Sequence, residues 1–234
     1  TNMADMFAYA SAFNQDLSDW DTGAVENMAD MFAHASAFNQ PIFNTTENVA
    51  TMKGMFYNTV ALNNVSLPET GAVTNMQEMF LKSGIATVAL PKTGAVTNMK
   101  KMFQETPSLT SVLLPETGEV TIMHDMFKDA TALTSVSLPK TGKVTTMEGM
   151  FRRASKITSV SLPQTGSLTN MLDMFQQATL LTQVQVQSTS AVLNMKAMFY
   201  QATAFNQDIR SWDVVNVTNF DNMFGGANAM VSAF

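Results

Sequence analysis

The sequence predicts an α/β repeat solenoid of about nine to ten units, each of about 24 residues and consisting of a strand, a turn and a short helix. Two repeating strings and one physical argument predict this fold. The string Met-x-x-Met-Phe recurs along the whole chain at intervals of 23 to 25 residues. A second string, Val-x-Leu-Pro-x-Thr-Gly, recurs between several of these motifs with the same period. A unit of this size cannot bury its own apolar face, so stacking is the arrangement that gives all units one core.

The Met-x-x-Met-Phe segments are expected to form the short helices on one side of the stack. Met99, Met102 and Phe103 fall at i, i+3 and i+4, which is the spacing of one helix face. Thr97 or Asn98, directly before the motif, has a side chain suited to cap the first turn of a helix.

Methionine is the unusual residue of the composition, because nineteen of the 20 copies occupy positions of this motif. Flexible thioethers fill irregular gaps in protein cores. A soft-metal site, for example for Cu(I), is the alternative interpretation of so many methionines. Since they repeat with the core period and accompany Phe, we favour core packing and expect no cofactor and no metal.

The Val-x-Leu segments are expected to form a parallel sheet on the other side of the stack. In Leu133-Thr-Ser-Val136-Ser-Leu138 the alternation turns Val136 and Leu138 inward and the serines outward. Pro-x-Thr-Gly then ends the strand, because Pro has no N–H for a ladder and Gly tolerates a turn. The candidate contact residues on the outward face are Ser66, Ser111, Ser135, Ser137, Ser159 and Ser161.

The composition excludes several classes of function. A net charge of -6 with only 14% charged residues leaves no basic patch for nucleic acid. No apolar run is long enough to cross a bilayer, so we expect no membrane insertion by this segment. The absence of Cys removes thiol catalysis, disulfides and thiolate metal sites together.

The repeats resemble the bacterial surface leucine-rich repeats of the BspA type. Leu-Thr-Ser-Val-Ser-Leu-Pro followed by Val-Thr-x-Met is similar to their repeat pattern. Residues 13–21 (FNQDLSDWD) and 205–213 (FNQDIRSWD) are similar to a subfamily with FNQDIxxWD and VTNMxxMF repeats, found in bacterial and microalgal surface proteins and lipoproteins. The central units, from about Leu62 to Val186, depart from it by carrying Leu-Pro-x-Thr-Gly. The resemblance implies a leucine-rich-repeat-like solenoid, a surface location, and binding or adhesion.

Two short motifs have a structural and a functional interpretation. Five Leu-Pro-x-Thr-Gly segments, which end at Gly71, Gly94, Gly118, Gly142 and Gly166, match the sortase recognition motif. They repeat with the solenoid period and lack a following apolar segment and basic tail, so we interpret them as turns. Asn44, Asn64 and Asn216 begin Asn-x-Ser/Thr sequons and are candidate glycosylation sites.

No residues suggest a catalytic site, so we predict that the chain is not an enzyme. His34 and His124 lie four motifs apart, and the chain has no Cys and no Gly-rich phosphate loop. Asp16, Asp19 and Asp21 form a small acidic group, but their spacing is not that of a calcium loop. We interpret them as solvated turn residues.

The sequence therefore favours a non-enzymatic extracellular surface repeat protein that mediates adhesion or protein or glycan interaction. The alternative is a structural subunit of an extracellular filament or coat, assembled through the solenoid ends or the sheet face. The partners would be a protein or glycan ligand, or copies of the chain itself, and no nucleic acid. Neither end carries a recognisable polar cap, so we expect residues 1–234 to be a single solenoid excerpted from a longer repeat array.

Overall fold

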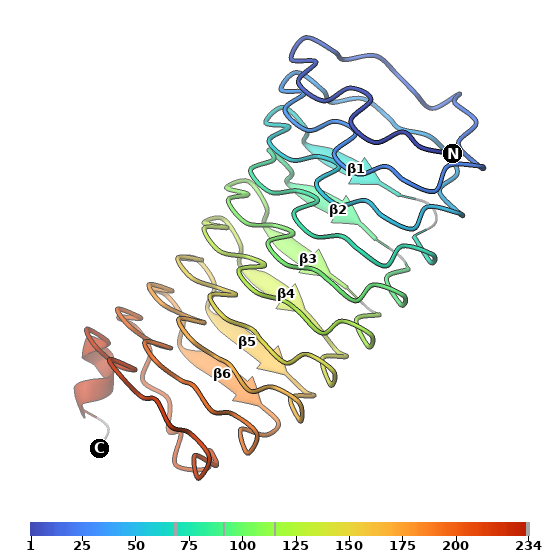
Figure 1. Ribbon diagram of the computed structural model, residues 1–234. Helices are drawn as coiled ribbons and strands as arrows, with labels where there is room; N and C mark the ends of the chain where they lie inside the picture. Colours follow the sequence, from blue (N-terminus) through green and yellow to red (C-terminus); the bar gives the residue numbers. More distant parts are fainter. Residues whose placement is uncertain (68–69, 91, 115, 233–234) are drawn as a thin grey trace.

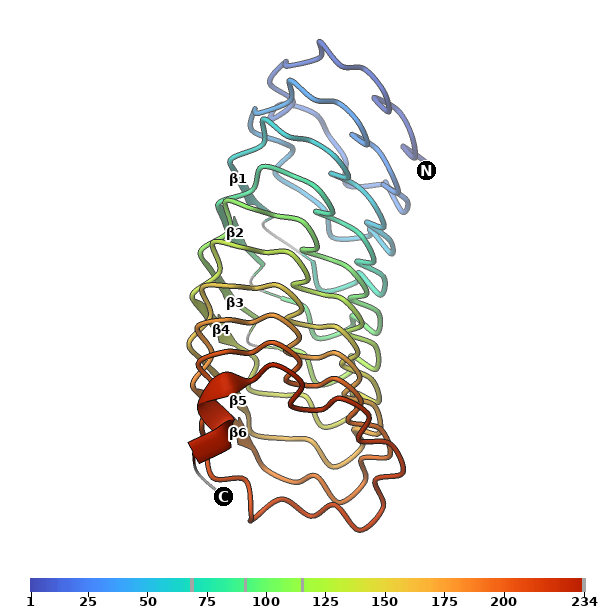
Figure 2. The same cartoon turned by 90° about the vertical axis from the view of Figure 1, so that its left-hand side faces the viewer.

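The computed structural model describes residues 1–67, 70–90, 92–114 and 116–232, and they form a rod of stacked coils (Figure 1). Each coil corresponds to one sequence repeat, and the first and last coils lie at opposite ends of the rod. In the view turned by 90° the coils lie one upon another, with the strands along one side (Figure 2). The predicted repeat solenoid is therefore confirmed.

Six short strands lie along one side of the rod. They are β1 (Asn64–Ser66), β2 (Thr87–Ala89), β3 (Ser111–Leu113), β4 (Ser135–Ser137), β5 (Ser159–Leu162) and β6 (Gln183–Val186). They pair in parallel as β1 with β2, β3 with β4 and β5 with β6. Equivalent residues of successive repeats are partners, for example Val112 and Val136. The central Val of each strand is buried or half-buried between exposed neighbours, as the alternation predicts.

The Met-x-x-Met-Phe segments form turns. The prediction that they form short helices opposite the strands, and with it the α/β class of the repeat unit, was therefore wrong. Within the described residues the only helical segment is η1, a 3-10 helix at Asn228–Ser232. The amide of Met102 donates to the carbonyl of Met99, three residues before it. The amide of Phe103, by contrast, donates to Met126 of the next coil at 2.9 Å. An α-helix would direct the Phe103 amide to its own coil instead.

Backbone conformation explains why no helix forms there. The third and seventh residues of these segments have a positive φ in every coil, for example 55° at both Lys101 and Glu105. A positive φ at the third of four residues is the mark of a type II turn and does not fit a right-handed helix. The amides of Lys101 and Glu105 donate to His124 and Lys128 of the next coil. These segments therefore carry a second coil-to-coil ladder, opposite the strands.

The core consists of columns of identical residues that run the length of the rod. Both motif methionines and the motif Phe are fully buried in all coils except those at the two ends. Successive Phe rings stack nearly parallel, with centroids 5.4 to 5.6 Å apart from Phe7 to Phe224. The predicted role of the methionines as core residues is confirmed, although the backbone that presents them is not helical.

A column of buried threonines joins successive coils at the turns that follow the strand positions. Its members are Thr22, Thr46, Thr70, Thr93, Thr117, Thr141, Thr165 and Thr189. The hydroxyl of Thr93 donates to the carbonyl of Glu116 in the next coil at 2.6 Å. Thr165 donates likewise to Ser188 at 2.6 Å. The Thr of each Leu-Pro-x-Thr-Gly segment is thus a buried structural residue, as the interpretation of these segments as turns expects. Other residues of these segments lie outside the described residues, namely Pro68, Glu69, Pro91 and Pro115.

The residue before each motif starts the turns. Asn98, proposed above as a helix cap, accepts a hydrogen bond at its Oδ1 from the amide of Lys100 at 3.0 Å. It therefore caps a turn rather than a helix. The same position forms isolated parallel bridges from coil to coil, from Asn2 to Asn219. Ile122 occupies this position in one coil and has no side-chain acceptor to offer the amide of His124.

Replacing Ile122 with Asn is therefore expected to stabilise the chain. An acceptor for the His124 amide should contribute about 0.5–1.5 kcal/mol, less the apolar contact of the half-buried Ile. Denaturant unfolding followed by circular dichroism measures the change. The reverse substitution Asn98→Ile is the matched control and should destabilise by a similar amount. A loss of stability in Ile122→Asn would contradict the capping role of this position.

The C-terminal coil is followed by η1. Met223, Ala227 and Met230 are buried there, and Met230 joins the continuous core. The segment lies beside the last coil in both views (Figures 1 and 2).

Candidate interaction surface

The outward side chains of the six strands form one regular uncharged surface, here called the strand face. Its members, all exposed, are Asn64, Ser66, Thr87, Ala89, Ser111, Leu113, Ser135, Ser137, Ser159, Ser161, Gln183 and Gln185. The six serines singled out from the sequence therefore lie together on one exposed surface. Leu113 is the one large apolar member and is 64% exposed.

A polar column borders the strand face and links the coils. The amide of Asn39 donates to Oδ1 of Asn14 at 2.8 Å, and the Thr134 hydroxyl donates to the carbonyl of Thr110 at 3.1 Å. The Thr182 hydroxyl donates to Thr158 in the same way, also at 3.1 Å. Because these groups are occupied by neighbouring coils, the column stabilises the stack.

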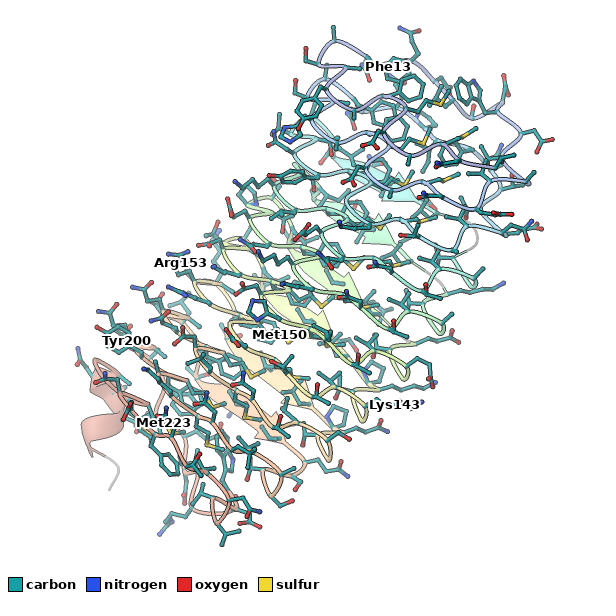
Figure 3. All side chains as sticks on the ribbon, viewed as in Figure 1. Phe13, Lys143, Met150, Arg153, Tyr200 and Met223 are labelled. Atoms are coloured by element: carbon teal, nitrogen blue, oxygen red, sulfur yellow. The ribbon has the colours of Figure 1, made fainter. Side chains whose placement is uncertain are left out.

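Charged side chains gather at the turns instead. Arg153 lies on the side of the rod formed by the Met-x-x-Met-Phe turns, here called the turn edge, and Lys143 lies on the opposite side (Figure 3). The Arg153 guanidinium donates to Asp129 of the preceding coil at 2.6 Å through Nε. The ammonium of Lys82 lies 3.6 Å from the carboxylate of Glu105. Such exposed pairs between coils contribute little to stability but balance the charges of this edge.

His124 lies between two carboxylates at the turn edge. Its Nε2 is 3.0 Å from Oδ2 of Asp125, and its Nδ1 is 3.7 Å from Oε2 of Glu148 in the next coil. Burial raises the pKa of Asp125, but the hydrogen bond from His124 and the nearby positive charges outweigh it, so the pKa lies below its usual value. At Asp30 and Asp173, burial prevails and the pKa is raised.

His34 belongs to a different cluster, with other aromatic residues near the first coils. Its ring stacks on Tyr9 with centroids 4.6 Å apart, and Nδ1 lies 3.0 Å from Nδ2 of Asn58. Each histidine thus has its own local partners.

The acidic group near the N-terminus forms turns. Oδ1 of Asp16 accepts a hydrogen bond from the amide of Ser18 at 2.8 Å, and Oδ1 of Asp21 accepts one from Gly23 at 3.0 Å. The bond from Ser18 lowers the pKa of Asp16. In the described part of the chain, no three His, Asp or Glu side chains gather to hold a metal ion. The two hydrogen bonds confirm Asp16 and Asp21 as turn residues.

The three sequon asparagines differ in their surroundings. Nδ2 of Asn44 donates to the carbonyl of Ser18 at 3.0 Å, and Nδ2 of Asn216 donates to Ser190 at 2.8 Å. A glycan on either nitrogen would compete with this bond between coils. Asn64 lies exposed on β1, where a glycan would cover part of the strand face. Glycosylation of the three residues stays a prediction.

Two depressions lie where strand-bearing coils meet coils with the Phe-Asn-Gln sequence. The larger has a volume of about 480 Å³ and lies between the range 39–44 and β1. The second, of about 290 Å³, lies between residues 186–190 and 211–213. Neither depression was predicted from the sequence. The available signal was the change of repeat type itself, from Gln40-Pro41 to Asn64-Val65 at equivalent positions.

The side chain of Gln207 covers the free edge of β6, near the second depression. Oε1 of Gln207 accepts a hydrogen bond from the amide of Val184 at 2.6 Å, and its Nε2 donates to the carbonyl of Val184 at 2.9 Å. The side-chain amide thus takes the place that a neighbouring strand would occupy.

One family model matches nearly the whole chain. Its description is Mycoplasma protein of unknown function, DUF285, and it matches residues 1–86, 83–183 and 157–233. No curated protein sequence matches the chain significantly. Within the described residues, no helix has the length and apolar character needed to span a bilayer.

Several solved structures are similar in fold at low sequence identity. A leucine-rich repeat protein of T. pallidum is 18% identical over 72% of this chain, with a TM-score of 0.40, and this chain spans only 60% of it. One from Bacteroides ovatus is 13% identical over 98% of this chain and 80% of its own, with a TM-score of 0.45. One from Eubacterium ventriosum is 13% identical over 89% and 82%, with a TM-score of 0.42.

Proposed function

Because the chain belongs to the DUF285 family, whose model matches nearly all of it, we propose that it is a non-enzymatic recognition module at the cell surface. The proposed activity is adhesion to a protein or glycan ligand in the extracellular space. The observation that supports it most is the strand face, which presents exposed hydroxyl and amide groups in regular rows. Such groups form hydrogen bonds with a ligand without the cost of removing charges from water.

The distribution of charged residues favours the strand face, rather than the turn edge, as the surface that contacts the ligand. None of the six strands contains a charged residue. At the turn edge, by contrast, Arg153, Asp129, Lys82 and Glu105 already pair with one another between coils. A ligand there would have to displace these pairs.

Placing charge on the strand face is expected to abolish ligand binding. The immobilised chain would be tested on glycan arrays and on panels of extracellular proteins, with the double variant Ser137→Lys/Ser161→Lys beside the wild type. Binding should fall at least tenfold, about 1.4 kcal/mol, because each lysine would have to be desolvated in the contact.

The matched control is Ser108→Lys/Ser167→Lys, which adds the same charge at exposed positions outside the strands. It should leave binding within twofold of the wild type. Equal losses in both variants would indicate a general charge effect and contradict recognition through the strand face.

One observation favours a second function, that of a structural subunit of a surface filament or coat. Leu113 is an exposed apolar residue in an otherwise polar, uncharged face. Such a face can associate laterally with a copy of itself. Sedimentation velocity and electron microscopy over a concentration series decide between the two. A persistent monomer would exclude assembly, whereas regular filaments or sheets would favour it over ligand binding.

A further inference from the structure

The ladder of coils is interrupted on one side between residues 39–44 and β1. The residues just before β1 still bond to the preceding coil. The amide of Ala61 donates to the carbonyl of Ser36 at 3.2 Å, and the amide of Asn63 donates to Oδ1 of Asn39 at 3.1 Å. Among the described residues, no hydrogen bond joins the range 39–44 to β1 itself. The depression of about 480 Å³ lies at this position.

A proline causes the interruption. Pro41 occupies the position that Val65 has in the next coil, and it has no N–H to donate to a ladder. The inward and outward positions are also exchanged between the two coils. Pro41 is exposed and Ile42 is buried, whereas the equivalent Val65 is buried and Ser66 is exposed. The range 39–44 therefore cannot continue the alternation of β1, and no strand precedes β1 in the described part of the rod (Figure 1).

This interruption leaves β1 with a free edge. β1 pairs with β2 alone, with Val65 opposite Val88. Alternate residues of a parallel strand bond to opposite neighbours. The amide of Thr87 reaches the carbonyl of Asn63 at 3.4 Å, so Asn63 and, two residues on, Val65 bond toward β2. It follows that the backbone groups of Asn64 and Ser66 face the depression, and an edge of this kind is a template for another extended chain.

The other end of the strand row indicates which chemical group satisfies such an edge. There the free backbone groups of Val184 are both bonded by the side-chain amide of Gln207. That amide has the same donor and acceptor as a peptide bond. At β1, neither Gln40 nor Asn44, which both line the depression, forms an equivalent bond to the strand in the described structure.

We propose that the junction between residues 39–44 and β1 binds an extended, uncharged peptide segment that pairs with Asn64 and Ser66 as an added strand. The proposal rests on the interaction role proposed above, because it identifies a ligand class and a place for it. The lining contains no ionisable side chain, which favours an uncharged segment. Ile42 and Val65 line the depression but are largely buried, so main-chain bonds supply most of the affinity.

The test uses the full chain and a synthetic peptide of residues 157–163, Ile-Thr-Ser-Val-Ser-Leu-Pro, which is an uncharged extended segment. Amide resonances are followed by NMR during titration. The peptide is expected to shift the amides of Asn64 and Ser66 and to slow their hydrogen exchange at least tenfold. The same peptide with N-methyl groups on alternate residues lacks the donors and should cause no such shift.

A matched pair of variants separates this site from the rest of the strand face. Ser66→Arg places a bulky side chain beside the depression and should weaken peptide binding at least tenfold. Ser137→Arg makes the same change at the equivalent position of β4 and should alter binding less than twofold. The variant Gln207→Ala should expose the edge of β6 and add a second set of shifts at Val184.

Three results would overturn the proposal. These are no shift at Asn64 and Ser66 at millimolar peptide, equal shifts with the N-methylated peptide, or shifts at these amides with an N-acetylglucosamine hexamer and not with the peptide. The array experiment on Ser137→Lys/Ser161→Lys is independent of this outcome. Loss of array binding in that variant without peptide binding would leave the strand-face function standing and remove the junction alone.

Discussion

Truncating Phe127 to alanine is expected to lower the free energy of unfolding by about 3–5 kcal/mol. Phe127 is fully buried, and its ring lies 5.5 Å from the rings of both Phe103 and Phe151. The backbone on either side is held by ladders to both neighbouring coils, so the coil has little freedom to close over the cavity. The loss should therefore include both the apolar burial and the cavity left behind.

Denaturant unfolding, followed by circular dichroism and by hydrogen exchange, measures this loss. The control Leu180→Ala removes an apolar side chain that is 51% exposed and should change stability by less than about 0.5 kcal/mol. In a stack where each coil contacts only its neighbours, a weak central coil should also divide one unfolding transition into two. A single unchanged transition in Phe127→Ala would contradict the view that the Phe column couples the coils.

The inward residues could be predicted from the sequence because the core period is the repeat period. Met99, Met102 and Phe103 were expected inside and are fully buried. The strands followed from the alternation around Val136, which fits the short strand Ser135–Ser137. Both results depend on side-chain spacing alone, which is a local property of the chain.

The helices could not be predicted correctly, because the same spacing is compatible with two backbones. Residues at i, i+3 and i+4 share a face in a helix, and they also do so in the pair of turns observed here. The next coil determines which backbone forms, because its carbonyls accept hydrogen bonds from the amides of Lys101 and Phe103. One local signal was present: Asp, Asn or Gly often stands third in the motif, as at Asp30, Gly54 and Asp125, and these residues tolerate a positive φ.

The candidate surface was predicted in part. Ser135 and Ser137 were expected on an outward face and are exposed there. The interruption before β1 was not predicted, although Pro41 at a strand position indicated it. The closure of β6 by Gln207 depends on a contact between coils and has no signal within one repeat.

Complete oxidation of the methionines by peroxide is expected to abolish cooperative unfolding. Each sulfoxide would place a polar oxygen in the dry core, at a cost of about 1–3 kcal/mol where it finds no hydrogen-bond partner. The two methionine columns run through the coils, apart from the last coil, where Phe220 takes the first position, so the cost accumulates along the rod. The sulfur atoms lie inside the coils among the stacked side chains (Figure 3).

The order of oxidation provides the internal control. Met6 is 51% exposed and should oxidise first, whereas Met150 is fully buried and should react only when the coils open. Peptide mapping by mass spectrometry follows each site, and thermal melts follow cooperativity. The melt should stay unchanged while only Met6 is oxidised, and Met6→Leu should behave as the wild type afterwards. An unchanged melt after verified oxidation of Met150 and its column would contradict the packing role of these methionines, because a buried sulfoxide cannot be neutral in a core that offers it no donor.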